Sequence, residues 1–471
     1  MLQNLLLFTP YVALIVGVLH LAGLHFFNED RAKVYSRIAR FWLIVSLFFA
    51  IIFYAQNPLE AFFNSNSYSI LFILVLNILI YHILGLSVSW FSSQNRTGGW
   101  FDILLLCATL FMSLLIMAEN LFALFICYAA LGLINYKLLQ INYEKKPILS
   151  VANLIGVLIF VLFAGSVGYF YYLLHGSLSY DVIKEYLWEN NQSFSLFFAV
   201  ICLILPFFYA LGIAPLHIAI EDKLSKSVLP VSHYFAIVLP LAVWGGFIKL
   251  NVMLYTVYAN TLTSAYLCFA LFSVFFGAIG ANARINLQRI YAYSSFYHFG
   301  LVLLLLSLGH KHTDFAGFIY LVTYLLSLNG AYLVFYSLKS HGEYLVSITG
   351  VVGLAETKPY ASGALSISLF SLIGMPPLIG FLGLFNLSYE MIKAEYFMSL
   401  GIIFVFLLLL FKAYLGIIKT AYFEHKVRVF DTVNKWVLTY MLLNILMIIL
   451  LLFNPYHLIE RLKDMFYVVF L

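Results

Sequence analysis

Two short stretches of this sequence interrupt long apolar segments in the same way. The first is LGIAPL at residues 211–216, the second is IGMPPL at residues 373–378, and both contain the pattern G-x-x-P-L. Proline removes a backbone donor and glycine loosens a helix, so freed carbonyl groups face a cavity or water. The alternative is a simple kink, since glycine and proline are common in membrane helices. The pairing of the two stretches favours broken helices, with the breaks at Gly212, Pro215, Gly374 and Pro377.

The composition places the surrounding chain in a membrane. Its 471 residues are 64% hydrophobic and 10% charged, and the mean hydropathy is +0.99. Soluble domains contain about 25% charged residues. The composition therefore excludes a soluble enzyme, a nucleic-acid-binding protein and a disordered scaffold. A span needs about 20 apolar residues plus a connection, so this length allows roughly 14 spans.

Apolar stretches of spanning length give the same number. They lie at roughly 5–27, 41–55, 68–91, 101–118, 121–141, 148–174, 194–220, 230–257, 261–281, 290–308, 315–338, 360–388, 396–418 and 436–453. The two breaks fall in the seventh and twelfth of these, an odd offset, so the two broken helices enter the membrane from opposite sides. This is typical of an inverted repeat in ion transporters. We predict an all-α polytopic membrane protein of about 14 transmembrane helices, with two inverted five-helix repeats and broken helices 7 and 12.

The basic residues support this span count. Loops after odd-numbered spans contain 17 of the 25 Lys and Arg residues, including Arg37, Arg40, Lys419 and Lys435, and loops after even-numbered spans contain 3. Such an asymmetry is the positive-inside pattern. It predicts that the odd loops lie in the cytoplasm or organelle matrix and that both termini lie on the opposite side. The four cysteines are scattered singly, and none has the CxxC spacing of a cluster or zinc site.

Several motifs, in a fixed order, resemble a known family. They are GIAPLH at 212–217, LPVS at 229–232, NLQRIYAYSSFYHFG at 286–300 and SLIGMPPLIGFLG at 371–383. They are similar to the signatures of the antiporter-like membrane subunits of respiratory complex I, and the length favours the subunit N type, the mitochondrial subunit-2 type. The resemblance implies an N-terminal three-helix segment at 1–100, a first antiporter-like repeat at 101–257, a second inverted repeat at 258–418, and a last transmembrane helix with an interfacial tail at 419–471.

The resemblance also implies a role without a catalytic centre in this chain. Such subunits couple quinone reduction elsewhere in the complex to proton movement along buried ionisable groups. Cofactors are therefore expected in partner subunits alone: NAD, FMN, iron–sulfur clusters and quinone. The expected partners are other membrane-arm subunits and the lipid bilayer, with no nucleic acid. The expected location is the bacterial inner membrane or the mitochondrial inner membrane.

The sequence departs from the family where the relay residues belong. The family's lysines of spans seven, eight and twelve correspond to Ala210, Pro240 and Leu384, and its span-five glutamate falls near Ala129. All four positions are uncharged. Conduction by this chain is therefore in doubt, and the usual proton path is expected to be missing or rebuilt.

Five ionisable residues remain as proton-relay candidates, and each has a structural alternative. Glu119 is either a substitute carboxylate or a solvated loop acid, and His217 either relays protons or bonds freed carbonyls. Lys249 either titrates or snorkels, His298 either relays or is a satisfied interior histidine, and Lys412 is the strongest candidate for a proton-carrying base.

Two other functions remain open. One is a stand-alone cation/proton antiporter or ion-coupled transporter of the same fold, which the missing lysines argue against. The other is a subunit of a related membrane-bound hydrogenase or formate-oxidising complex.

Overall fold

The computed structural model describes residues 9–26, 32–52, 62–94, 98–141, 151–424, 429–451, 453 and 455–468. The start of the first predicted span and the end of the second lie outside these residues. The chain divides into two compact units. The first contains Met1–Leu211, Val238–Asn260 and Asp464–Leu471, and the second contains Gly212–Ile237 and Thr261–Lys463.

The first unit is a bundle of apolar helices. Its helices are α2 (Thr9–Phe26), α3 (Ala32–Ile52), α4 (Ser67–Ser93), α5 (Gly99–Met117), α6 (Leu121–Gln140), α7 (Val151–Leu173), α8 (Tyr180–Glu189), α9 (Phe194–Leu211) and the first part of α12 (Leu239–Asn282). Sequential neighbours such as α2 and α3, and α5 and α6, pack together. Helix α12 also packs tightly here, because a Cβ on Gly245 would lie 2.8 Å from the Phe72 ring and one on Gly246 2.8 Å from Leu115.

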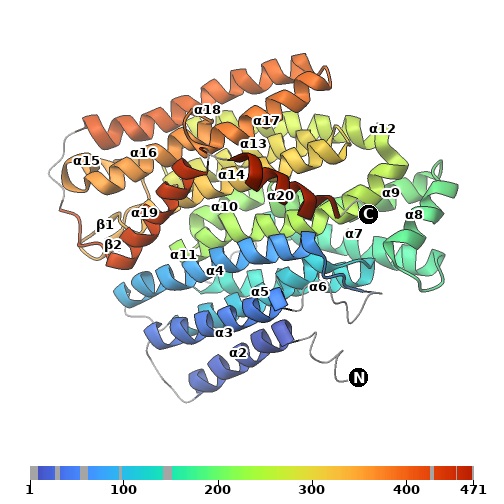
Figure 1. Ribbon diagram of the computed structural model, residues 1–471, viewed down its shortest axis with the longest axis horizontal. Coiled ribbons are helices and arrows are strands. Elements are labelled where there is room, and N and C mark those ends of the chain that lie inside the picture. The colour runs from blue at the N-terminus through green and yellow to red at the C-terminus, as the bar shows by residue number, and fades with distance from the viewer. Residues whose placement is uncertain are drawn as a thin grey trace. The chain divides into compact units, whose positions relative to one another are not determined.

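The second unit is built around one enclosed helix, α14 (Lys311–Phe335), of which nearly every residue is buried. It packs against α13, α16, α17 and α19 (Figure 1). The other elements are α10 (Ile218–Lys226), α11 (Leu229–His233), η1 (Tyr234–Val238), α13 (Leu287–Leu306), β1 (Lys339–Ser340), β2 (Glu343–Tyr344), η2 (Ile348–Val351), α15 (Leu354–Thr357), α16 (Pro359–Ile373), α17 (Ile379–Lys393), α18 (Phe397–Phe423), α19 (Lys435–Leu450) and α20 (Pro455–Tyr467), whose last residues belong to the first unit.

Both G-x-x-P-L stretches leave helical geometry. Helix α9 ends directly before Gly212 and α16 directly before Gly374, and both glycines are left-handed, with φ of 74° and 81°. Glycine adopts this conformation without a Cβ penalty. Helix α10 begins only at Ile218 and α17 at Ile379. Each break contains one cis bond to proline, Ala214–Pro215 and Pro376–Pro377.

The predicted span count agrees with these helices. In the described part of the chain, ten helical segments are long and apolar enough to cross a membrane. One of them, Leu229–Asn282, has 54 residues, enough for two spans, and its backbone is non-helical at Tyr258. With α13, the broken pair α16 and α17, and α19, the helices in the described part of the chain account for the fourteen predicted spans.

Three local features differ from the expectations. Helix α3 begins at Ala32, so Lys33, Arg37 and Arg40, which the span prediction assigns to a loop, belong to the helix, because Lys and Arg are good helix formers. A short helix, α8, occupies a predicted loop, and β1 and β2 form a small antiparallel hairpin. These elements are too short to be detected as membrane spans from hydropathy.

Candidate functional site

The first unit contains a partly buried ion pair between two of the five relay candidates. Lys249 Nζ on α12 lies 2.8 Å from Glu119 Oε1, which follows α5. The Lys249 side chain is 4% exposed and that of Glu119 30%. The ammonium group also lies 5.9 Å from the centre of the Tyr68 ring, within cation–π range. Lys249 therefore pairs inside the unit rather than snorkelling to a surface.

The backbone around Glu119 is fixed from two sides. The Glu119 amide donates to the Phe62 carbonyl at 2.9 Å, and the Glu119 carbonyl accepts from the Tyr180 amide at 3.3 Å. The neighbouring Asn120 caps α6 through a 2.9 Å bond from the Phe122 amide to its side chain. Glu119 is therefore held in a connected segment rather than in a free loop.

In the second unit, His298 occupies the interior of α13. It is 1% exposed, and its Nδ1 lies 2.7 Å from the Tyr320 hydroxyl on α14. The ring stacks on Tyr324 at a centroid distance of 4.4 Å, and the Tyr324 hydroxyl donates to Ser295 Oγ at 2.7 Å. The His298 Nε2 atom has no hydrogen-bond partner among the described residues. Imidazole can accept a proton at one nitrogen and release it from the other. In His298, Nδ1 is hydrogen-bonded to Tyr320, and Nε2 is the nitrogen without a partner among the described residues.

His217, the fourth candidate, lies directly before α10 and among aromatic rings. Its ring stacks on Phe276 at 5.3 Å and meets Phe296 and Tyr293 edge-on at 5.2 and 6.3 Å. In the part of the chain that the structure describes, its Nδ1 has no hydrogen-bond partner.

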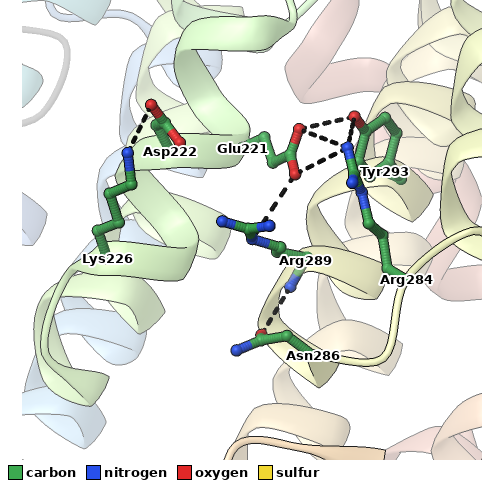
Figure 2. Close-up of polar contacts among 7 residues, drawn as sticks. All are labelled: Glu221, Asp222, Lys226, Arg284, Asn286, Arg289 and Tyr293. Atoms are coloured by element: carbon green, nitrogen blue, oxygen red, sulfur yellow. Dashed lines mark hydrogen bonds and ion pairs between the residues drawn. The ribbon is translucent and has the colours of Figure 1, made fainter. Parts of the chain in front are cut away.

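Next to His217 is a cluster of charged residues that are not among the five relay candidates. Glu221, one helical turn further along α10, accepts a 2.6 Å bond from the Tyr293 hydroxyl. Arg284 Nη2 lies 3.1 Å from Glu221 Oε1 and donates to the Tyr293 hydroxyl at 2.7 Å, and Arg289 Nε lies 3.7 Å from Glu221 Oε1. Figure 2 shows this convergence on one carboxylate, while Asp222 points away to Lys226. The cluster fastens the second half of broken helix seven to the start of α13.

Part of this cluster can be recognised in the sequence. Arg289 and Tyr293 belong to the quoted 286–300 motif, four residues apart, so they share one face of α13. The acidic partner is harder to select, because Glu221 and Asp222 are adjacent and only the packing decides which one faces that helix.

The fifth candidate, Lys412, does not join either site. It lies on an exposed face of α18, and no described residue forms an ion pair or hydrogen bond with it.

The positions that correspond to the family's relay residues carry apolar side chains. A Cβ on Gly374, for example, would lie 2.8 Å from Leu384 at the second break.

A polytopic helical bundle with two broken helices and ionisable side chains enclosed between its helices is the architecture of an ion-translocating membrane protein. The family described as "NADH:quinone oxidoreductase/Mrp antiporter, TM" matches residues 118–410, and the chain belongs to this family.

Individual relatives agree with this membership. NADH-quinone oxidoreductase subunit N 1 of Aquifex aeolicus is 27% identical over 403 residues, which cover 84% of each chain. Respiratory complex I from Thermus thermophilus contains a chain of the same fold, with a TM-score of 0.77, 22% identity, and 96% of this chain and 98% of that chain covered. An archaeal membrane-bound sulfane sulfur reductase contains another, with a TM-score of 0.83 at 16% identity and 98% of both chains covered.

Proposed function

We propose that this chain is a subunit N-type component in the membrane arm of a proton-translocating oxidoreductase that passes electrons from NADH or another donor to quinone. The observation that carries the proposal is the family match across residues 118–410, together with the likeness to a subunit N over most of both chains. The paired helix breaks fit a subunit that moves ions. In this proposal the chain contributes no redox chemistry and binds no cofactor, and the redox groups belong to its partners.

The proposed location is a bacterial or mitochondrial inner membrane, with both termini on the side away from the cytoplasm or matrix. Its support is the concentration of 17 Lys and Arg residues in the loops after odd-numbered spans. Labelling of single cysteines placed at the two termini with a membrane-impermeant reagent tests this orientation. Labelling in intact cells or mitoplasts is expected, and protection at both ends contradicts it.

Within each unit, the proposed proton-carrying groups are those that the structure encloses. In the first unit, the pair of Lys249 and Glu119 exchanges a proton when a neighbouring charge changes. In the second unit, His298 passes a proton between its Tyr320-bonded nitrogen and its open nitrogen. His217 is the candidate at the first break. The family's usual lysine positions take no part, because they are apolar here.

The experiment that tests the function is affinity purification from native membranes in mild detergent, followed by mass spectrometry. Quinone-reducing and iron–sulfur subunits that co-purify in a fixed ratio are the expected result. A chain that purifies alone, or with transporter subunits alone, contradicts the proposal. That outcome favours the second candidate, an antiporter of the same family, which the family's description also includes.

A further inference from the structure

Helix α18 carries a face that the described chain leaves uncovered. Its exposed residues recur at helical spacing, and its other side, including Leu410 and Tyr414, is buried in the second unit. We call this uncovered side the α18 face. It consists of Gly401, Val405, Leu408, Lys412, Leu415, Gly416 and Lys419. An exposed apolar face on a membrane helix is ordinarily a lipid contact, but two features of this one are unsuited to lipid.

The first feature is the charge of Lys412 at depth. Helix α18 has 27 residues, about 40 Å, and so extends roughly 5 Å beyond a hydrocarbon core of about 30 Å at each end. For a helix centred on the core and perpendicular to it, Lys412 lies about 11 Å below the nearer, C-terminal boundary. A helical Cα–Cβ bond tilts toward the N-terminus, away from that boundary, so the stem of about 6 Å does not reach the headgroups. An unpaired ammonium at this depth is unfavourable, because the hydrocarbon core offers it neither water nor a counter-charge.

The second feature is open space over small residues. Gly416 lies one turn beyond Lys412, and a Cβ built on Gly416 or on Gly401 meets nothing within 4 Å. Small residues at a membrane-helix surface let a second backbone approach closely. Glycine in a helix interior otherwise destabilises the helix relative to alanine. The space beside the unpaired charge therefore fits a helix better than it fits disordered lipid tails.

We propose that the α18 face is an interface for a transmembrane helix of a neighbouring membrane-arm subunit, which places an Asp or Glu carboxylate opposite Lys412. Charge complementarity selects this partner, because the Lys412 ammonium needs an acidic group and no described residue forms an ion pair with it. A second copy of this chain is unsuitable, since a twofold contact of the α18 face sets Lys412 against Lys412. The inference rests on the proposed function for the existence of such a neighbour. It also assigns Lys412 to a contact between subunits rather than to a relay within the chain.

The test uses the complete complex in its native membrane. A photo-crosslinking amino acid at Leu408, one turn from Lys412, is compared with the same amino acid at Val157, an exposed position on α7 of the first unit. The expected product from Leu408 is a crosslink to one membrane-spanning peptide that contains Asp or Glu. Crosslinks to lipid alone overturn the proposal.

Two substitutions supply an independent readout, the fraction of the chain found in the high-mass complex on a native gel. Lys412→Glu and Lys412→Leu are both expected to lower this fraction about 10-fold, equivalent to roughly 1.4 kcal/mol, while the total chain in the membrane is unchanged. Lys419→Glu, two turns along the same face near the helix end, is the matched control and is expected to change it less than about twofold. An undiminished complex in Lys412→Leu overturns the proposal, because a lipid-facing position gains from losing its charge.

A charge exchange completes the test. Lys in place of the crosslinked acid, combined with Lys412→Glu, is expected to restore the complex. Continued loss of the complex contradicts the pairing. The identity of the co-purified subunits, read separately in the unsubstituted complex, decides the proposed function. A wrong function and a wrong interface therefore give different results.

Discussion

Lys249 Nζ and Glu119 Oε1 lie 2.8 Å apart although their residues are separated by 130 positions in the chain. The pair joins a spanning helix to the short connection between α5 and α6 within the first unit. The expected relay positions near Ala129, Ala210 and Pro240 are uncharged, so this pair brings buried charge to the unit at other positions. Its geometry also makes the two partners unequal, because Lys249 is almost fully enclosed and Glu119 retains partial exposure.

This inequality predicts an asymmetric loss of stability. Glu119→Gln leaves an enclosed, uncompensated ammonium and is expected to cost about 3 kcal/mol of unfolding free energy. Lys249→Met leaves a carboxylate whose side chain is 30% exposed rather than enclosed, so its cost is expected to be clearly smaller. The double variant is expected to be more stable than Glu119→Gln alone. Thermal unfolding of the purified complex measures all three. Equal losses in the two single variants contradict the assigned burial.

The Nε2 atom of His298, which has no hydrogen-bond partner among the described residues, leads to a prediction about the coupling of proton movement to electron transfer. Tyr320→Phe removes the hydroxyl bonded to His298 Nδ1, and His298→Ala removes the imidazole itself. If this side chain carries protons, both variants lower proton translocation more than they lower electron transfer. The number of protons moved per electron therefore falls. Proton and electron fluxes in proteoliposomes measure the ratio.

The control for this experiment is the neighbouring Tyr297. Its buried hydroxyl donates to a backbone carbonyl, that of Ile403, at 3.0 Å. Tyr297→Phe therefore removes a buried hydroxyl that is not bonded to His298 and keeps the edge-on ring contact with His298 at 5.3 Å, so the ratio is expected to stay unchanged. Wild-type ratios in Tyr320→Phe and His298→Ala contradict a proton-carrying role for His298.

The second helix break predicts a severe packing defect at Gly380. A Cβ at this position would lie 1.7 Å from the carbonyl oxygen of Ser371, a backbone atom across the break. The Gly380 amide also donates to Ser371 Oγ at 3.1 Å, so the two half-helices are in direct contact. Gly380→Ala is expected to destabilise the protein by about 3 kcal/mol or more, because the backbone must move. Gly363→Ala on α16 is the control, since its Cβ meets nothing within 4 Å, and it is expected to be neutral or slightly stabilising. A similar unfolding temperature for both variants contradicts the close approach.

The loop before α19 has a predicted pH dependence. Backbone bonds from Gly342 and His341 to the Asp431 carboxylate, at 2.9 and 3.0 Å, hold the pKa of Asp431 below its usual value, and Lys339 contributes. A lowered folded-state pKa gives stabilisation that is complete above the unfolded value, about 3.9, and disappears as pH falls through the folded value. Amide exchange at His341 and Gly342 is therefore expected to lose protection selectively below about pH 4. Asp431→Asn is expected to remove this dependence. Identical pH profiles in the two proteins contradict the assignment.

The sequence by itself determined the span count, the two broken helices and the family. Hydropathy, glycine and proline act within a few residues, so they can be read without knowing what packs against what. Only the tertiary structure decided which ionisable groups meet. The partners of Lys249 and of Tyr293 lie 130 and 72 positions away, and helix packing selects them.

The direction in which Lys412 points is also decided by the tertiary structure and not by the sequence. Helix α18 is apolar on all sides, so its sequence contains no amphipathic pattern from which the direction of a residue follows. The sequence predicted a lysine deep in the membrane. The tertiary structure placed it on the uncovered side, because the orientation of a helix about its own axis is set by the neighbours against which it packs.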